Sequence, residues 1–436
     1  MTVPAHVPPD LVVEFDIYDD SLADDFNHCT AELPPMCYTE ANGGHWILSG
    51  FDEIESVFRD GQTFANWNAS IPVEMSEGRG RFIPLEYDGP EHTAYRQILL
   101  PHFSPIRIRQ LEGQLRDLVN ELIDGFPDNG SCDFMAHFAR PFPARMFLAL
   151  MGWPTDRVKE FGGWVDDFLY GGGGSSDDPR VKETRAAAMK AVYDYFSEFV
   201  EERRNNPADD ITTALVEARL PSGRTLTEKE ILDYIFILLI AGLHTVEGAL
   251  AFGVMYFSHN PDERDRLIVD PSILPTAVEE LLRWEPPAWG SARVATRDVL
   301  VWGQQVKAGD KILLPHQTGN RDSRKVPNPE TFDMTRKPNP HLTFGAGPHR
   351  CLGAHLARME LRVAFEELHR RVPDYAVDSS RPMVTHMAQV RGVVSMHITY
   401  TPEPEKVNAA SERTDSAMAE VSASTVEYYK SGEWGG

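Results

Sequence analysis

The stretch His341-Leu-Thr-Phe-Gly-Ala-Gly-Pro-His-Arg-Cys-Leu-Gly-Ala-His355 decides the fold, because it places Cys351 between a glycine-rich loop and the start of a helical pattern. Apolar residues recur at helical spacing after the cysteine until Pro373 stops the run. The unpaired N–H groups and the dipole at a helix N-terminus favour a thiolate at Cys351. The glycines allow a close approach to a flat ligand, and Phe344 adds an apolar wall. Cys351 is therefore suited to be the axial thiolate ligand of a haem iron.

Two other roles for Cys351 are a buried structural thiol and a zinc ligand. Most lone cysteines are structural, but packing alone does not require the glycine spacing around this one. Zinc would need a second cluster such as C-x-x-C, which the sequence lacks. A haem ligand is therefore the preferred interpretation.

The pattern Phe344-Gly-x-Gly347-x-His349-x-Cys351-x-Gly353 resembles the haem-binding signature of the cytochrome P-450 family. The resemblance implies haem b (iron protoporphyrin IX) as the cofactor and Cys351 as the axial iron ligand. The residues that it places against the haem are Phe344, Gly345, His349, Cys351 and Gly353. It also implies a mainly α (α+β) fold, which is helix-rich with small β-sheets in a single domain.

The resemblance extends over about residues 30–400 and is similar in detail to the bacterial, soluble camphor-hydroxylase branch of the family. The similar segments are Asn42-Gly-Gly-His-Trp-Ile47, Lys311-Ile-Leu-Leu-Pro315 and Gly392-Val-Val-Ser395. The tyrosine that binds the ketone in the camphor enzyme has no match near Arg79-Gly-Arg-Phe82. Camphor itself is therefore not the expected substrate.

The chain has 436 residues, with no internal repeat and no convincing linker before residue 400. We expect an irregular N-terminal segment over residues 1–30 and one cytochrome P-450 domain over residues 31–401. Residues 402–436 have few large aliphatic side chains and no periodicity, which predicts a disordered tail.

Charge and hydropathy limit the class of protein and its partners. The formal net charge of -24 argues against nucleic acid or an anionic membrane as a partner. Residues 1–20 lack a basic region followed by an apolar run, and the longest apolar stretch, Tyr234 to Leu243, is half a membrane span. The four cysteines have irregular spacings that do not suggest a disulfide framework. We expect a soluble, cytoplasmic protein.

Turn residues and apolar periodicity predict the main elements. We expect a hairpin or short strand at 42–48, an irregular loop over 65–90, and strands at 299–302 and 311–315. Helices are expected over 51–59, 105–125, 140–151, 155–170 and 180–204, and another opens at 88–96. The glycine run from Tyr170 to Pro179 is either the tip of a lid over the substrate channel, as the resemblance implies, or a surface connector.

His92 and Arg96 stand four residues apart, so they share one face of a helix. From the residues alone this is a solvated polar face. The resemblance implies that they bind the haem propionates, which need positive hydrogen-bond donors when they are buried. Arg293 and His349 are the other two donors that it implies.

A second motif lies in the helix that starts near Thr225-Leu-Thr-Glu228. Ala241 and Gly242 leave room beside the backbone, and Thr245 can bond back to the carbonyl four residues earlier. The motif resembles the family's Ala-Gly-x-Asp/Glu-Thr, which implies that Thr245 manages dioxygen and protons. His244 replaces the expected acid. It is either a proton relay or a packing residue, and both roles stay open.

Glu280 and Arg283 form an i, i+3 pair on a predicted helix. Alone, they are two surface charges. The resemblance implies a buried ion pair that locks the fold behind the haem. The later Pro329-Glu-Thr-Phe332 has Thr331 where the family has an arginine, which puts the third member of that network in doubt.

The function expected from the resemblance is that of a haem-thiolate monooxygenase. One atom of dioxygen would enter a small or medium apolar substrate, by hydroxylation or O-dealkylation. The expected substrate pocket consists of Ile237, Ile240, Trp289, Val393 and Val394. Coupling, dehydrogenation or peroxide-driven chemistry, and a non-catalytic haem sensor, are the alternatives.

No flavin or reductase domain is fused to the chain, so electrons must come from partners. The resemblance implies a [2Fe–2S] ferredoxin and its ferredoxin reductase. Because the whole chain is acidic, docking of a ferredoxin needs a local basic patch. The predicted patch consists of Arg96, Arg107, Arg109, Arg350 and Arg358.

Overall fold

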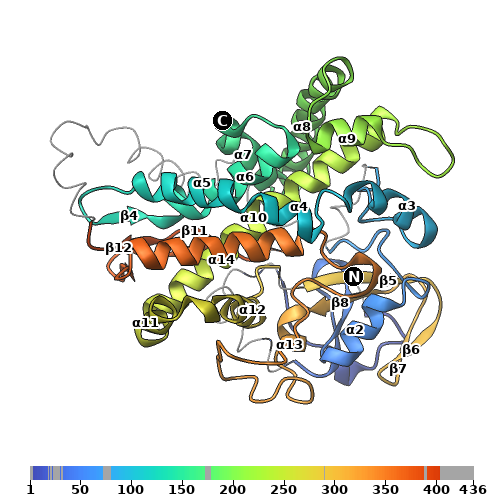
Figure 1. The fold of residues 1–436 in the computed structure, drawn as a ribbon. Coiled ribbons are helices and arrows are strands. Elements are labelled where there is room, and N and C mark those ends of the chain that lie inside the picture. The colour runs from blue at the N-terminus through green and yellow to red at the C-terminus, as the bar shows by residue number, and fades with distance from the viewer. Residues whose placement is uncertain are drawn as a thin grey trace.

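The structure is a computed structural model that describes residues 3–17, 19, 22, 30, 33–71, 80–171, 178–288, 290–386 and 390–402. It is helix-rich with small sheets, which confirms the predicted fold class. Helices fill the upper and left part of Figure 1, and the largest sheet lies with α2 (Phe51–Arg59) at the lower right. Two predictions concern residues outside the described ranges. They are the prediction for the glycine run, at residues 172–177, and that for the tail, at residues 403–436.

The central element is α10 (Glu228–His259), against which helices from both halves of the chain pack. Its start is fixed by a capping box, because the Thr227 side chain accepts from the Glu230 backbone N–H while the Glu230 side chain accepts from the Thr227 backbone N–H. Its length and composition would suit a membrane span, but 67% of its most apolar window is buried inside the protein. This helix is the core of the fold (Figure 1).

The remaining helices are α3 (Gly89–Leu99), α4 (Pro105–Gln110), α5 (Glu112–Asp124), α6 (Pro141–Met151), α7 (Val158–Tyr170), α8 (Pro179–Asn205), α9 (Ile211–Glu217), α11 (Pro261–Val269), α12 (Leu274–Trp284), α13 (His316–Asn320) and α14 (Ala354–Arg371). They include the predicted ones, with the range 105–125 divided into α4 and α5, and also α9, α11 and α13, for which no range was predicted. The large hydrophobic core includes side chains from α5, α6, α10 and α14. Side chains of this core, among them Phe147, Leu238 and Leu361, also line the cavity of the candidate site.

The largest sheet has the strand order β1-β2-β8-β5-β3. Its strands are β1 (Met36–Thr39), β2 (His45–Leu48), β8 (Lys311–Pro315), β5 (Gly290–Ala295) and β3 (Phe64–Ala65). The pair β2–β8 is parallel and the other pairs are antiparallel. The turn between β1 and β2 uses the positive φ angles of Asn42, Gly43 and Gly44, which explains the Asn-Gly-Gly sequence.

Three smaller sheets complete the described strands. Strands β4 (Ser131–Asp133), β12 (His397–Thr399) and β9 (Ala376–Val377) form one, β10 (Val384–His386) and β11 (Gly392–Ser395) form the second, and β6 (Val299–Val301) and β7 (Gln304–Val306) form the third. The N-terminal segment is described in part, and Val12 bridges to Tyr38 at the edge of the largest sheet.

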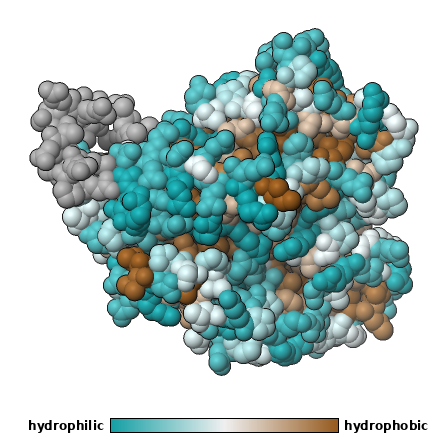
Figure 2. Space-filling view, viewed as in Figure 1, coloured by the Kyte–Doolittle hydropathy of each residue, from teal (hydrophilic) through white to brown (hydrophobic). Residues whose placement is uncertain are grey.

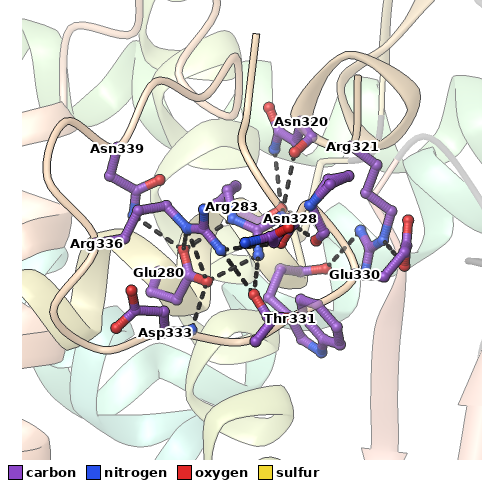
Figure 3. Close-up of polar contacts among 12 residues, drawn as sticks. Glu280, Arg283, Asn320, Arg321, Asn328, Glu330, Thr331, Asp333, Arg336 and Asn339 are labelled. Atoms are coloured by element: carbon purple, nitrogen blue, oxygen red, sulfur yellow. Dashed lines mark hydrogen bonds and ion pairs between the residues drawn. The ribbon is translucent and has the colours of Figure 1, made fainter. Parts of the chain in front are cut away.

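A buried polar network lies between α12 and the segment before the cysteine loop (Figure 3). Glu280 and Arg283 are fully buried, and their ion pair measures 2.8 Å. Arg336 Nε lies 3.2 Å from Glu280 Oε2, and Asn339 donates to the same oxygen at 3.0 Å. The third member of the network, which Thr331 put in doubt, is therefore Arg336. Thr331 contributes its backbone carbonyl to both arginines.

Candidate active site

The loop that carries Cys351 is held by its own backbone. The Cys351 N–H donates to the Phe344 carbonyl at 2.8 Å, and α14 begins three residues after the cysteine. Gly347 has a φ of +68°, and a Cβ built there would lie 2.6 Å from the Phe58 carbonyl oxygen. Only glycine fits this approach to the end of α2. The motif spacing therefore has a packing reason as well as a conformational one.

Cys351 is surrounded by protein but keeps accessible surface, because it opens into the cavity that it lines. Burial raises the pKa of the Cys351 thiol, while the Gly353 backbone N–H and the charge of Arg96 oppose that rise. A metal ion bound to the sulfur would remove the thiol proton outright. The site is thus poised to become a thiolate when a cation binds.

The cavity measures about 310 Å³ and lies between the cysteine loop and α10. One wall contains Phe344, Gly345, His349, Cys351 and Gly353. The opposite wall contains Leu238, Ala241, Gly242, Thr245, Val246 and Ala249, all from one face of α10. The structure therefore brings the two sequence motifs together across one space.

Thr245 Oγ1 donates to the Ala241 carbonyl at 3.2 Å, which is the predicted back-bond within α10. Gly242 has a packing role, because a Cβ built there would lie 2.6 Å from the ring of Phe147. The small residues of the motif therefore leave space for a side chain of α6 as well as for the cavity.

His244 does not line the cavity. Its Nε2 lies 2.6 Å from Asp166 Oδ1 on α7, and its Nδ1 is buried with no hydrogen-bond partner among the described residues. Burial lowers the pKa of His244, but the charge of Asp166 and its hydrogen bond outweigh burial, so the pKa is raised. Glu247 pairs with Arg140 at 3.1 Å and does not replace the missing acid.

Two basic side chains beside the cavity, Arg293 and His92, have no carboxylate partner within the described ranges. Arg293 is buried, donates to the Ala292 carbonyl at 2.7 Å, and meets no carboxylate at ion-pair distance within the described ranges. Burial lowers the pKa of Arg293 to about 10 and that of His92 to about 4. His92 Nε2 is buried without a partner, and its ring lies 3.9 Å from that of His349. Buried donors of this kind need acceptors.

Two of the edge residues already have partners. His349 Nε2 donates to Asp88 Oδ1 at 3.2 Å, and Arg96 donates to the Arg350 carbonyl. Burial raises the pKa of Asp88, but hydrogen bonds from His349 and Asn66 lower it to about 2. Asp88 is therefore a permanent anion that orients His349. The sequence analysis missed this role, although Asp88 stands just before the helix that carries His92.

These observations fit a haem. The cavity is walled by a cysteine on one side and by small residues on the other, and unpaired buried donors at its edge suit two carboxylates. The fold and the site together define a haem-thiolate protein.

The comparisons give the family. A family model described as cytochrome P450 matches residues 271–371. The chain is 33% identical over 91% of its length, and 97% of the relative's, to a probable cytochrome P450 127A1 of Sinorhizobium fredii. It is 35% identical to a methyl-branched lipid omega-hydroxylase of Mycobacterium tuberculosis, over 85% of this chain and 87% of that one.

A solved structure agrees. The crystal structure of CYP101J2 superposes with a TM-score of 0.82 and 29% identity, and covers 92% of this chain and 100% of that one. The chain belongs to the cytochrome P450 family. The predicted family, the enzyme class of oxygen-incorporating oxidoreductase, and haem b as cofactor are therefore confirmed.

The predicted substrate pocket needs correction. Ile237, Ile240, Val393 and Val394 do not line the cavity, and Trp289 lies outside the described residues. Ile237 and Ile240 pack against the main core. Ile240 lies on a different face of α10 from Thr245, whereas Ile237 stands one turn before Ala241 but is not part of the cavity lining. The apolar residues that do line the cavity near Thr245 are Phe147, Leu238, Val246, Ala249, Pro287 and Ala288.

The predicted basic patch is also only partly available. Arg358 pairs with Glu279 at 2.6 Å, and Arg107 Nη2 lies 3.5 Å from Asp209. Arg109 and Arg350 are exposed and make no ion pair within the described part of the chain. These two arginines are the ones free to meet an acidic partner.

Proposed function

We propose that this P450 inserts one atom of dioxygen into a small or medium apolar substrate, by hydroxylation or O-dealkylation. The observation that supports this proposal most is the cavity that Cys351 and Thr245 share from opposite walls. The bound haem would supply the iron at which dioxygen is activated. The chain's own residues orient that group and the substrate, and manage protons.

In this proposal Cys351 is the axial ligand. His92, Arg96, Arg293 and His349 would hold the propionates. The main support is the buried His92 Nε2, which has no partner among the described residues, and the buried Arg293 guanidinium, which meets no carboxylate at ion-pair distance there. Each propionate would compensate a charge or donor that the folded chain leaves buried. The family resemblance implies all four side chains, and the geometry supports His92 and Arg293 among them.

The substrate is expected to be apolar, because the cavity near Thr245 is lined by carbon. Phe147, Leu238 and Pro287 present no hydrogen-bonding side-chain group, so a polar substrate group placed there would lose its hydration without compensation. The relative named as a methyl-branched lipid omega-hydroxylase is consistent with this chemistry. Aliphatic or alkyl-ether substrates are therefore the first to test.

Electrons would come from a [2Fe–2S] ferredoxin and its reductase. Exposed Arg109 and Arg350 offer positive charge near the cysteine loop, and exposed Ile106 and Leu100 offer apolar contact beside them. Figure 2 shows a hydrophobic spot within a hydrophilic surface where α4 lies in Figure 1. This face suits an acidic carrier with a small apolar contact.

The carbon monoxide difference spectrum of the reduced protein tests the haem-thiolate assignment. The wild type should give the band characteristic of a thiolate-ligated haem, and Cys351→Ser should lose it. Cys37→Ala, at a buried thiol of the sheet region, should keep it. A wild-type spectrum without this band would contradict the assignment. Analysis of the products formed from an alkyl-ether library with ferredoxin would then distinguish oxygen insertion from coupling or dehydrogenation. If no substrate gave a product, the protein would more closely fit a non-catalytic haem sensor.

A further inference from the structure

The contact between α7 and α10 contains a buried ion pair that the family motif does not specify. Asp166 and His244 approach to 2.6 Å, and their side chains are only 14% and 11% exposed. Histidine occupies the position at which the resembled motif has an acid. The carboxylate is instead supplied from another helix.

The surroundings of His244 favour its charged form. Burial opposes an imidazolium, but Asp166 faces it from α7, Glu247 adds negative charge from α10, and Arg140 opposes with positive charge. The net direction is a raised pKa, so the ring carries protons on both nitrogens over more of the neutral range. The Tyr170 ring, 6.5 Å from the imidazole, is the nearest aromatic neighbour.

The two nitrogens of the His244 ring differ in their hydrogen bonding. Nε2 donates to Asp166, which fixes the ring and its tautomer. Nδ1 is buried and has no partner among the described residues. A proton on Nδ1 is thus held by the charge of Asp166 but is not engaged by any described acceptor. It is the transferable one, and His244 directly precedes Thr245, which lines the cavity.

We propose that Asp166 is a positioning residue for proton delivery, because it orients the His244 imidazole and keeps its Nδ1 protonated. Proton delivery toward Thr245 then requires the contact between α7, which carries Asp166, and α10, which carries His244. The Nδ1 proton passes, through a water molecule, to the Thr245 hydroxyl, which releases its own proton into the cavity that it lines. Nδ1 then takes up a proton from solvent, while Asp166 stays ionised throughout. The inference rests on the proposed monooxygenase function and deepens it.

A variant series with two kinds of readout tests the proposal. Asp166→Asn should lower product formed per reduced cofactor consumed at least threefold, increase peroxide release, and change the solvent deuterium isotope effect. Asp166→Glu should retain most of the coupling, and the exchanged pair Asp166→His with His244→Asp should recover part of it. Glu160→Gln, which removes an exposed carboxylate from the same helix, is the matched control and should behave as wild type.

A second readout, the pKa of His244, does not depend on turnover. NMR of the histidine-labelled holoenzyme measures it as a function of pH. The signal of His244 is assigned as the one that is missing in His244→Ala. The pKa of His244 should fall below its ordinary value in Asp166→Asn. If coupling and isotope effect in Asp166→Asn match wild type while only the thermal unfolding midpoint falls, the pair is purely structural and the proposal is overturned. A wild type without the thiolate carbon monoxide band would instead overturn the proposed function itself.

Discussion

Arg336 Nε lies 3.2 Å from Glu280 Oε2, although 56 residues separate the two in the chain. The same guanidinium donates to the Thr331 carbonyl at 2.7 Å, so it reaches the position in the chain where an arginine was expected. The network behind the haem site is thus complete but is assembled from a different sequence position.

Removing Arg336 should therefore be costly. Arg336→Met leaves the buried Glu280 with one positive partner fewer, and we expect a loss of roughly 3 kcal/mol in the free energy of unfolding. Urea titration of the purified holoenzyme measures this. Arg324→Met removes a half-exposed arginine paired with Asp322 and Glu53, and should cost less than about 1 kcal/mol. Equal losses in the two variants would contradict a buried network role.

Arg293 should have opposite effects on the protein with and without haem. Without an anion, its buried charge is unfavourable, as the lowered pKa of about 10 indicates. Arg293→Met should therefore leave the haem-free chain as stable as wild type or more so, while the holoenzyme loses haem at least tenfold faster. Haem transfer to apomyoglobin measures the rate. A variant that destabilises both forms alike would contradict propionate binding.

Glu360 on α14 is a buried carboxyl that lines the cavity, and burial raises its pKa to about 8. Because the folded-state pKa lies above the unfolded one, the stability associated with the neutral acid is present below pH ~4.5 and is lost as the pH rises toward ~8. Because one pKa unit corresponds to about 1.4 kcal/mol, Glu360→Gln should match the stability of the wild type to within about 1 kcal/mol at pH ~5 and exceed it by about 5 kcal/mol at pH ~9.

Urea titrations at the two pH values check this prediction, with Glu112→Gln as control. The hydrogen bond from Arg362 lowers the pKa of Glu112, against the opposing effect of burial. Its stabilisation is present above pH ~4.5, so Glu112→Gln should lose stability there. Equal pH profiles for Glu360→Gln and wild type would show that Glu360 is ionised at neutral pH.

The Asp166–His244 pair should show the opposite pH trend to that of an ordinary carboxylate pair. The folded-state pKa of His244 is raised, so its stabilisation is fully present below the unfolded pKa of ~6.5 and is lost as the pH rises through the raised value. Asp166→Asn should cost roughly 3 kcal/mol at pH ~6 and less at pH ~10. A difference independent of pH would indicate an uncharged hydrogen bond.

Charge reversal on the face near the cysteine loop should weaken ferredoxin-dependent turnover. Arg109→Glu and Arg350→Glu should each raise the KM for a [2Fe–2S] ferredoxin several-fold at low salt, and the difference should shrink at high salt. Arg266→Glu, at an exposed position on α11, is the control. Unchanged KM values would place the docking site elsewhere, even if the substrate-binding spectrum stayed normal.

The motifs predicted most of the site because they are local. The loop around Cys351 and the turn at Asn42 carry their conformational requirements in consecutive residues. Asp166 and Arg336 were not predicted, since each acts on a residue far along the chain and has no local pattern. The pocket face of α10 was misjudged because that helix is apolar on every side, so periodicity does not show which side chains meet the cavity rather than the core.

The ring of Phe147 packs directly against Gly242. The ceiling of the cavity at this point is formed by a side chain of α6, which contributes nothing to the oxygen-side motif. We therefore expect the size of the admitted molecule to change when this one ring is exchanged, while Thr245 and His244, for which we propose the proton-handling roles, stay unchanged. A substitution at Phe147 would thus alter which substrates fit, without altering the residues of α10 to which we assign the reaction.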